Sequence, residues 1–481
     1  MHSLAVVKTF GVMLLLFSFT LLPPIAVSLF YGDGEIGHLS VSWSLSLALG
    51  SLLWLPVRKS TVALRHRDAF VVVALLWTTL VLLGATPFVM GLGTSFTDAV
   101  FESVSGFTTT GATVLAGLDE MAPSLLFYRQ EIQWLGGIGV IVSAVALLPM
   151  LGVGGMQLYR AETPGPMKRD KISPRIAVAA QRLWHLYAAL TLACAVLFWW
   201  AGMTPFDAIA HSLATISTGG FSTHDASLAY FDSRAIENIA MVFMLLGAIN
   251  FALHFVAWRQ FSLQVYWQNS EARVFLFTVL VATLLSGYLL WSGNVYEDFA
   301  RALQSAAFEV VSVITSTGFG IADFAHWPSM LPALLVILSI VGGCAGSTAG
   351  GVKMIRVVLV LKHISRELHR LIHPQQNQTM RFDERIVTSD VTEAVWGFIA
   401  VYFVTYAIVM LLLIHDGMDH VSAFGAVAAC LNNLGPGLGE FNSSFAAASD
   451  FAKWLLSITM LLGRLEIFTF LVLLTPGFWR G

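Results

Sequence analysis

Long apolar stretches, each separated from the next by a short polar segment, recur along almost the whole chain. A helix needs about 20 predominantly apolar residues to cross the hydrocarbon core of a bilayer. Stretches of that length predict ten membrane spans, at residues 9–30, 40–57, 69–91, 124–150, 183–202, 236–258, 273–292, 328–361, 391–415 and 451–476. The first could also be a secretory signal peptide, but its apolar run is long enough to span and further spans follow directly. The pattern therefore predicts an all-α polytopic membrane protein.

The composition agrees with this prediction. Of the 481 residues, 57% are hydrophobic and only 11% are charged, whereas about a quarter of a soluble domain is charged. Cys194, Cys344 and Cys430 lie in or beside apolar segments without CxxC spacing, so neither a disulfide nor a cysteine metal site is expected. No Ser, His and Asp set and no carboxylate pair indicates catalysis. We therefore expect no enzyme activity and no organic cofactor in this chain.

Basic residues are sorted to one side of the predicted spans. Most of the 26 lysines and arginines fall in alternate connecting segments, above all in 58–67, 152–182 and 353–385. The positive-inside rule makes these segments cytoplasmic, and it puts both termini in the cytoplasm. The opposite side is acidic, which would raise the local concentration of cations. Alternatively, acidic loops are simply what remains once the basic residues have been sorted inside.

After the second span, the chain repeats one plan four times: a span, a short amphipathic stretch, a glycine-containing loop and a span back. The loops read TTTGAT, ISTGGF, TSTGFG and NNLGPG, and their first glycines are Gly111, Gly219, Gly318 and Gly435. The preceding stretches read FTDAVFESVSGF, PFDAIAHSLATI, YEDFARALQSAAFEVVSVI and MDHVSAFGAVAACL. Because these stretches are too short to cross a bilayer, we interpret them as re-entrant half-helices.

Irregular backbone at membrane depth is tolerated only where protein buries it or where it lines a water-filled path. Four such loops related by pseudo-fourfold symmetry can converge on one axis, where their carbonyl oxygens replace the hydration shell of a cation. Glycine permits the positive φ that such turns need. Close packing of helices through small residues is the alternative, and it accounts for a single loop better than for four in register. The repeats therefore predict one central pore.

The four loops and several longer motifs resemble the TrkH family of potassium-translocating subunits, within the wider Trk, Ktr and HKT superfamily. The motifs are QWLGGIGVIV at 133–142, GGMQLYRAETPGP at 154–166, KISPRI at 171–176, GAINF at 247–251, GGCAGSTAGGVK at 342–353 and GRLEIF at 463–468. The resemblance implies four membrane-pore-membrane repeats around the pore, preceded by two extra transmembrane helices. The corresponding units are 1–67, 68–160, 161–265, 266–372 and 373–481. It also implies a homodimer that takes up potassium across the bacterial inner membrane.

Within this family, the potassium ligands are expected to be the backbone carbonyls of the two residues before each glycine. They are Thr109, Thr110, Ser217, Thr218, Ser316, Thr317, Asn433 and Leu434. The fourth loop departs from the pattern, because Asn432, Asn433 and Leu434 stand where hydroxyls are expected. We therefore expect an asymmetric filter with modest selectivity over sodium. A proton- or sodium-coupled symporter with the same pore is the alternative, while inverted repeats of an alternating-access transporter do not fit four repeats that run the same way.

A glycine-rich segment, GGCAGSTAGG, interrupts the predicted span 328–361. Each interior glycine weakens a helix by about 1 kcal/mol relative to alanine, so five glycines in ten residues favour a broken helix over a tight helix-helix face. The resemblance makes this segment an intramembrane gating loop. Its gate residues are Gly342, Gly343, Gly346, Ser347, Thr348 and Gly350.

Arg464 falls inside the last predicted span, where a cation costs at least about 2.5 kcal/mol. One interpretation is a salt bridge with Glu466 or Glu131. The resemblance favours the other, in which Arg464 lies just below the filter, repels the permeating cation and helps the gating loop hold the conduit shut.

The two basic cytoplasmic segments 152–182 and 353–385 are too short to fold as separate domains. The resemblance implies a regulatory partner that binds there, a TrkA-type cytosolic ring of nucleotide-binding domains that responds to ATP, ADP or NAD. The alternative is that these segments only fix topology or contact anionic membrane lipids. No nucleic-acid partner is expected. His369 and His373 lie four residues apart without the acid of an HExxH motif, so we expect a solvated basic helix there rather than a metal site.

Overall fold

The computed structural model describes residues 3–60, 62, 66–151, 174–328, 330–374, 379–383 and 385–480. Its regular structure is almost entirely helical, as the apolar pattern predicts. Six helices are long and apolar enough to cross a membrane, or up to eight when each of two sharply bent helix pairs counts as one span, within these described ranges. The protein is therefore a multi-pass membrane protein.

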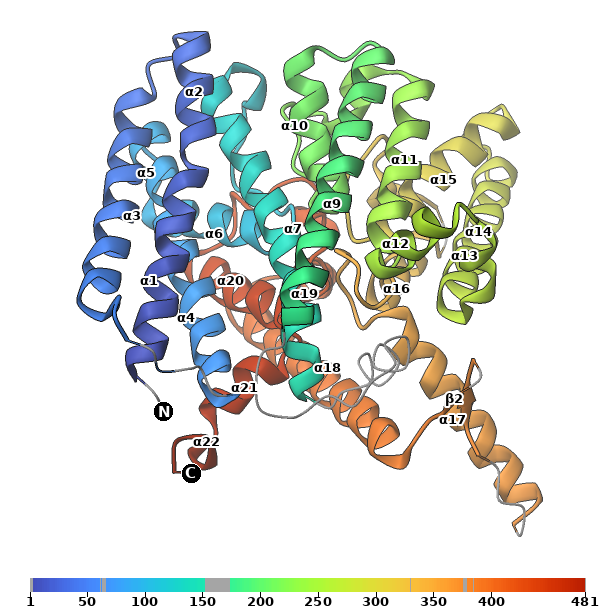
Figure 1. The fold of residues 1–481 in the computed structure, drawn as a ribbon. Coiled ribbons are helices and arrows are strands. Elements are labelled where there is room, and N and C mark those ends of the chain that lie inside the picture. The colour runs from blue at the N-terminus through green and yellow to red at the C-terminus, as the bar shows by residue number, and fades with distance from the viewer. Residues whose placement is uncertain are drawn as a thin grey trace.

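The N-terminal unit is a helical hairpin that packs beside the first repeat (Figure 1). Its helices are α1 (Ser3–Thr20), α2 (Leu22–Tyr31) and α3 (Ile36–Val57). A Cβ on Gly11 would lie 2.9 Å from the backbone nitrogen of Trp54, and a Cβ on Gly50 would lie 2.9 Å from that of Leu15. The two glycines therefore let α1 and α3 approach closely.

The first and second repeats follow in chain order. Repeat 1 contains α4 (His66–Gly84), α5 (Thr86–Leu92), α6 (Phe96–Phe107), the short 3-10 helix η1 (Leu118–Glu120) and α7 (Pro123–Leu151). Repeat 2 contains α9 (Pro174–Trp200), α10 (Pro205–Ile216), η2 (Ser227–Phe231), α11 (Arg234–Ala248), α12 (Phe251–Gln260) and α13 (Gln264–Gln268). The predicted boundary between residues 160 and 161 lies outside the described residues, as does most of the basic segment 152–182.

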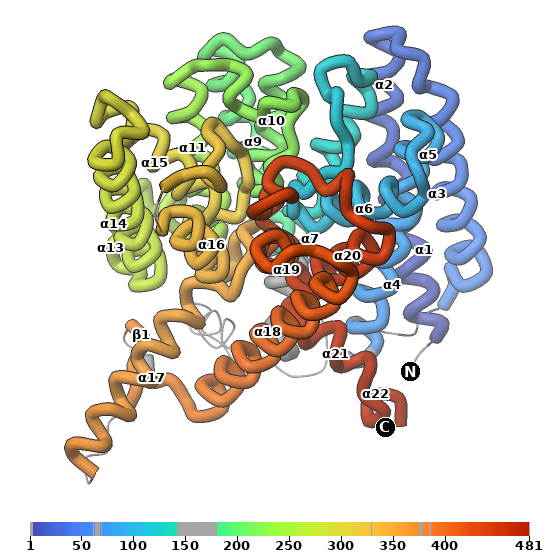
Figure 2. The backbone as a smooth tube through the Cα atoms, turned by 180° about the vertical axis from the view of Figure 1, so that it is seen from behind, coloured from blue at the N-terminus to red at the C-terminus, as the bar shows by residue number. Residues whose placement is uncertain are grey.

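The third and fourth repeats complete the bundle. Repeat 3 contains α14 (Ser270–Ser292), α15 (Phe299–Ile314), η3 (Phe324–His326), α16 (Leu331–Val341) and α17 (Met354–Ile372), followed by an antiparallel pair of short strands, β1 (Arg381–Phe382) and β2 (Arg385–Ile386). Repeat 4 contains α18 (Ser389–His415), α19 (His420–Leu431), η4 (Gly439–Phe441), α20 (Asp450–Arg464), α21 (Phe468–Leu474) and α22 (Pro476–Arg480). Both termini lie at the end of the molecule from which α17 projects (Figures 1 and 2).

The predicted half-helices are present as α6, α10, α15 and α19. Local capping explains where they begin. Ser95 and Thr204 accept hydrogen bonds from the N–H groups of Asp98 and Asp207, and aspartates cap the other two helices directly. A side-chain oxygen at this position satisfies donors that have no partner within the helix. Acidic residues also suit the positive end of the helix dipole.

Three of the predicted spans are not continuous helices. The predicted spans 236–258 and 451–476 each consist of two helices joined at a sharp bend, since α11 and α12 meet at 103° and α20 and α21 meet at 110°. The first bend falls where Ile249 is extended and Asn250 caps the next helix. The second falls at Glu466 and Ile467, which both have a positive φ. The third, 328–361, is divided into α16 and α17, so the expected break in it is confirmed.

Candidate cation-conduction site

The four half-helices end in one shared turn. In each loop, one backbone N–H donates a 2.8 Å hydrogen bond to the carbonyl oxygen five residues earlier, and the donors are Thr110, Gly219, Thr317 and Leu434. The residue before each donor has a φ between 51° and 53°, and these residues are Thr109, Thr218, Ser316 and Asn433. The residue after each donor is a glycine with a φ between 77° and 98°, and these are Gly111, Gly220, Gly318 and Gly435. The loops are therefore structural equivalents.

This equivalence corrects the alignment of the second loop. Alignment on the first glycine pairs Gly219 with Gly111, but Gly220 has the left-handed φ and Gly219 does not. Gly219 occupies the position of the hydrogen-bond donor before the turn glycine. The pair that matches Thr109 and Thr110 is therefore Thr218 and Gly219, not Ser217 and Thr218. Because two glycines are adjacent in this loop, the sequence does not show which of them makes the turn.

The four turns surround a single axis. Each turn glycine lies so close to the next loop that a Cβ would meet the carbonyl oxygen of that loop's hydrogen-bond donor. The pairs are Gly111 with Gly219, Gly220 with Thr317, Gly318 with Leu434 and Gly435 with Thr110. Because the fourth loop meets the first, the contacts close into a ring. The glycines are therefore required by close approach as well as by their positive φ.

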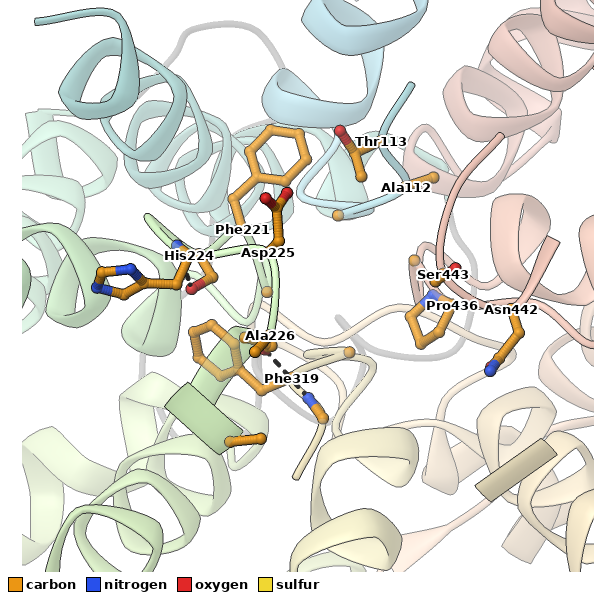
Figure 3. Close-up of a pocket in the computed structure, with 18 of the residues that line it drawn as sticks. Ala112, Thr113, Phe221, His224, Asp225, Ala226, Phe319, Pro436, Asn442 and Ser443 are labelled. Atoms are coloured by element: carbon orange, nitrogen blue, oxygen red, sulfur yellow. Dashed lines mark hydrogen bonds between the residues drawn. The ribbon is translucent and has the colours of Figure 1, made fainter. Parts of the chain in front are cut away.

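A cavity of about 460 Å³ opens directly beside this ring (Figure 3). The four turn glycines and the residues that follow them line it. In its wall, His224 lies 2.5 Å from Asp119, and the oxygens of Asp225 accept hydrogen bonds from the N–H groups of Gly117 and Leu118. The hydrogen bond from His224 lowers the pKa of Asp119 below its ordinary value. The first and second repeats are thus tied together around the mouth of the ring.

Buried polar side chains within the half-helices hold the chain that leaves each turn. Glu102 accepts hydrogen bonds from the N–H of Val114 at 3.1 Å and from the Thr113 hydroxyl at 3.0 Å. Glu309 accepts from the N–H groups of Ile321 and Ala322, at 2.9 and 3.0 Å. The sequence analysis did not identify these side chains. Their signal was a carboxylate within a short amphipathic half-helix at membrane depth.

The same helical position holds a histidine in the second repeat. His211 is buried, and its Nε2 lies 2.9 Å from Ser222 Oγ, in the chain after the turn. The fourth repeat has Ala426 at this position, which can make no such bond. The side chains that hold the chain after each turn therefore differ between the four repeats, as the loop sequences do.

Helix α7 braces the second loop from outside the ring. Gln133 Nε2 donates a 2.6 Å hydrogen bond to the carbonyl of Gly219, and its Oε1 accepts one from the N–H of Phe221 at 3.1 Å. The guanidinium of Arg129 lies 4.1 Å from the centre of the Phe221 ring and forms a buried 2.7 Å ion pair with Glu102. The first two half-helix loops therefore share one set of polar contacts.

The side-chain amides of the fourth loop form hydrogen bonds to neighbouring loops and helices. Asn433 Nδ2 donates to Thr110 Oγ1 at 2.9 Å and to the carbonyl of Met460 at 3.0 Å. Asn432 accepts a hydrogen bond from Tyr402 at 2.5 Å and donates one to Ser339 at 3.0 Å. The sequence analysis saw only that hydroxyls were missing here. The amides instead connect the loop to its neighbours.

The segment between α16 and α17 is irregular throughout. Gly342, Gly346 and Gly351 have φ values of 71°, 74° and 77°, and Lys353 has a φ of 79°. We call residues 342–353 the gate loop, after the role that the sequence analysis expects for them. Its backbone is held partly by repeat 2, since the N–H of Cys344 donates to the carbonyl of Ala248 at 2.8 Å.

The gate loop lies directly against the base of the ring. The Thr348 hydroxyl lies 3.1 Å from the Thr218 hydroxyl and donates to the carbonyl of Gly247 at 2.9 Å. The N–H of Gly350 donates to Ser316 Oγ, and a Cβ on Gly350 would collide with the carbonyl of Asn432. The loop therefore contacts the second, third and fourth ring loops at once.

Arg464 ends α20 beside the gate loop and is buried. Its Nη1 donates a 2.8 Å hydrogen bond to the carbonyl of Thr348. Among the described residues, its Nε and Nη2 have no hydrogen-bond partner. Glu466 pairs with Arg356 at 2.6 Å rather than with Arg464, and Glu131 forms no ion pair with it in the described chain. The salt-bridge interpretation is therefore wrong, and Arg464 is a buried cation against the gate loop.

Comparison with known proteins agrees with this architecture. The TrkH family of cation transport proteins matches residues 41–477. The chain is 50% identical to the Trk system potassium uptake protein TrkH of Vibrio parahaemolyticus and 48% identical to that of Escherichia coli K12, with all of each chain covered. It is 37% identical to TrkG of Escherichia coli K12, over 100% of this chain and 99% of TrkG.

The crystal structure of the potassium transporter TrkH from Vibrio parahaemolyticus superposes with a TM-score of 0.93 at 47% identity, covering both chains completely. A helical, multi-pass membrane protein with these matches is a cation transport protein by class. The chain belongs to the TrkH family.

Proposed function

We propose that this protein takes up potassium across the bacterial inner membrane, through a filter formed by the four ring loops. The observation that carries the proposal is the closed ring of contacts between each turn glycine and the carbonyl oxygen of the next loop. Backbone carbonyls around one axis replace the water shell of a bare cation. Relatives named as potassium uptake proteins, at 48 to 50% identity over the full length, support potassium as the cargo.

The proposed ligands follow the corrected register. They are the backbone carbonyls of Thr109, Thr110, Thr218, Gly219, Ser316, Thr317, Asn433 and Leu434. The unequal fourth loop and the missing polar support at Ala426 favour modest selectivity over sodium. Acidic side chains around the cavity, such as Asp225 and Asp323, would concentrate cations at its mouth.

The gate loop and Arg464 form the proposed gate. A loop pressed against the base of the filter obstructs an ion that leaves it, and an unneutralised buried cation repels that ion. Opening then requires the gate loop to leave Thr218, Ser316 and Arg464. The motion is proposed to come from outside the chain, from a TrkA-type cytosolic ring that binds nucleotide and contacts the cytoplasmic surface near α17. The pore protein itself is proposed to act as a homodimer with cytoplasmic termini.

Potassium flux into liposomes that contain only the purified protein tests the pore. A variant that lacks residues 344–349 should conduct potassium faster than the parent. Flux that follows the imposed voltage, and that does not change with a proton or sodium gradient, supports a channel-like mechanism. Dependence on such a gradient would instead favour the coupled symporter. Equal fluxes in parent and deletion variant would show that the gate loop does not obstruct the pore.

A further inference from the structure

A single buried carboxylate holds both limbs of the gate loop. Glu271 lies in the first turn of α14 and is buried. Its Oε1 accepts a hydrogen bond from the N–H of Ala345 at 2.7 Å and another from the N–H of Ile355 at 3.2 Å. Ala345 lies near the start of the gate loop, and Ile355 follows its end. The same oxygen therefore joins the entry and the exit of the loop.

The chemistry of a helix start explains why a carboxylate suits this position. The first N–H groups of a helix have no partner within it, and they attract negative charge. Lys353 occupies the N-cap position of α17 but makes no side-chain cap hydrogen bond. Glu271 supplies the missing acceptor from a different helix. Movement of the gate loop away from the filter relative to α14 breaks one or both of its hydrogen bonds.

Glu271 is also next to the cytoplasmic surface. The N–H of Ser270, the preceding residue, lies 3.3 Å from Oδ1 of Asp383, in the turn between β1 and β2. Lys362 on α17 donates a 2.8 Å hydrogen bond to the carbonyl of Arg381 in β1. The hairpin thus touches both α17 and the start of α14. The hairpin therefore contacts the residue that directly precedes Glu271.

We propose that Glu271 is a positioning residue that latches the gate loop in its obstructing position. The inference rests on the proposed gate function. It differs from the proposed role of Arg464, because Glu271 accepts from N–H groups near the two ends of the loop, whereas Arg464 donates to the carbonyl of Thr348 between them.

Cys344 gives a direct readout of the latch, because it lies in the gate loop beside Ala345 and is buried. The experiment compares the full-length parent with Glu271→Ala, Glu271→Gln and the control Asp390→Ala in lipid nanodiscs. Asp390 is an exposed acid in the first turn of α18. N-ethylmaleimide modification of Cys344 is followed by mass spectrometry, and potassium flux is measured on the same proteins in liposomes.

Glu271→Ala should speed modification of Cys344 by about tenfold, as expected when a hydrogen bond to a charged acceptor is lost, and it should raise basal flux. Glu271→Gln keeps an acceptor oxygen at the same reach and should restore most of the protection. Cys194 and Cys430 should be modified no faster than in the parent, which separates a released gate loop from general unfolding. Asp390→Ala should behave as the parent.

The two ways to fail are distinct. Unchanged Cys344 modification in Glu271→Ala overturns the latch, whatever the flux. Faster modification without any rise in flux keeps the latch but contradicts the proposed gate. A rise in the modification of all three cysteines, with no rescue in Glu271→Gln, would show that Glu271 only stabilises the fold and would also overturn the proposal.

Discussion

Arg464 and Thr348 are 116 residues apart in the chain, and a 2.8 Å hydrogen bond joins the guanidinium of one to the carbonyl of the other. Thr348 also lies 3.1 Å from Thr218 in the second ring loop. The end of α20, the gate loop and the ring are therefore connected through one residue. A change at Arg464 should therefore alter the position of the gate loop before it alters the ring loops.

Arg464→Ala should raise basal potassium flux in the absence of any partner. A hydrogen bond to a charged group contributes about 1.5–3 kcal/mol, so the open fraction should rise by roughly 10- to 150-fold. Arg464→Lys keeps the charge without the planar guanidinium, and an intermediate flux would separate repulsion from hydrogen bonding. The measurement is flux into liposomes, with the exposed Arg480→Ala as control. An Arg464→Ala variant no leakier than the parent contradicts this role.

The register of the second loop predicts unequal effects at neighbouring glycines. Gly220→Ala should abolish selective uptake, because alanine is strained at a φ of 77° and its Cβ would strike the backbone carbonyl of Thr317. Gly219→Ala should be milder, since its Cβ would meet the side chain of Gln133, which can move. The potassium-to-sodium flux ratio of each variant measures these effects.

Adding Gln133→Ala to Gly219→Ala should relieve the contact and recover part of the uptake, although the hydrogen bonds that Gln133 makes would be lost. The same change should rescue nothing in Gly220→Ala. Equal losses in the two glycine variants would restore the alignment on the first glycine.

The parts of the fold that depend on local signals could be predicted. The stretches FTDAVFESVSGF and PFDAIAHSLATI coincide with α6 and α10, because Ser95 and Thr204 cap them and apolar residues fill the half-helix. The break between α16 and α17 was equally visible, because five glycines within ten residues weaken a helix. These features are decided by residues next to one another in the sequence.

Features set by distant contacts could not be predicted. The bend of 110° after Arg464 depends on positive φ at Glu466 and Ile467, and neither residue type favours that conformation. The contacts of Glu271 with the gate loop span 74 and 84 residues. No periodicity relates such positions, so the polar supports of the site became visible only in three dimensions.

A loop outside the membrane spans predicts a pH effect. Burial raises the pKa of Asp33, but hydrogen bonds from Ser28, Ser124 and Glu35 outweigh it, so the pKa lies below its ordinary value. A lowered pKa stabilises the fold above the ordinary carboxyl pKa of about 4, and this stability is lost as the pH falls through the lowered value. Asp33→Asn should therefore lower the Tm at pH 7.

The difference in Tm between the parent and Asp33→Asn should shrink as the pH is lowered from 7 towards 3.5, because the parent then loses the same charge. Thermal unfolding in detergent, recorded at each pH, measures this difference in Tm. The exposed Glu297→Gln should show no comparable difference at any pH. A gap between Asp33→Asn and the parent that stays constant with pH would mean that the charge of Asp33 is irrelevant.

The basic residues of α17 predict where the proposed cytosolic ring would bind. Replacing Lys362, Arg366 and Arg370 by glutamine should weaken co-purification with a TrkA-type ring and blunt nucleotide-dependent flux. Flux of the same variant without the ring serves as the reference, because Lys362 also donates a hydrogen bond to the carbonyl of Arg381 in the hairpin that contacts the start of α14. Binding should also weaken with salt, which screens exposed charges.

A triple change at Arg58, Lys59 and Arg259, which are exposed on other helices or loops, removes the same number of charges and serves as control. If both triple variants lose the ring equally, net charge rather than α17 directs the partner. If neither does, the partner does not depend on this surface.

Variants at the buried pair of Glu102 and Arg129 should change the stability of the fold and the ion selectivity separately. Glu102→Leu leaves Arg129 buried without its counter-charge, which typically costs 3–5 kcal/mol, so the Tm should fall sharply. Adding Arg129→Met replaces both charges by apolar groups and should recover much of that stability. It cannot restore the acceptor for the N–H of Val114 or the donor to the carbonyl of Ser222.

The double variant should therefore fold well but discriminate poorly between potassium and sodium, since the chain that leaves two of the ring glycines has lost its supports. Thermal unfolding and the potassium-to-sodium flux ratio, measured on the parent, both single variants and the double variant, complete the cycle. A double variant as unstable as Glu102→Leu would mean that the hydrogen bonds to Thr113 and Val114, and not the buried charge, account for the loss. A double variant with parental selectivity would show that these supports do not shape the filter.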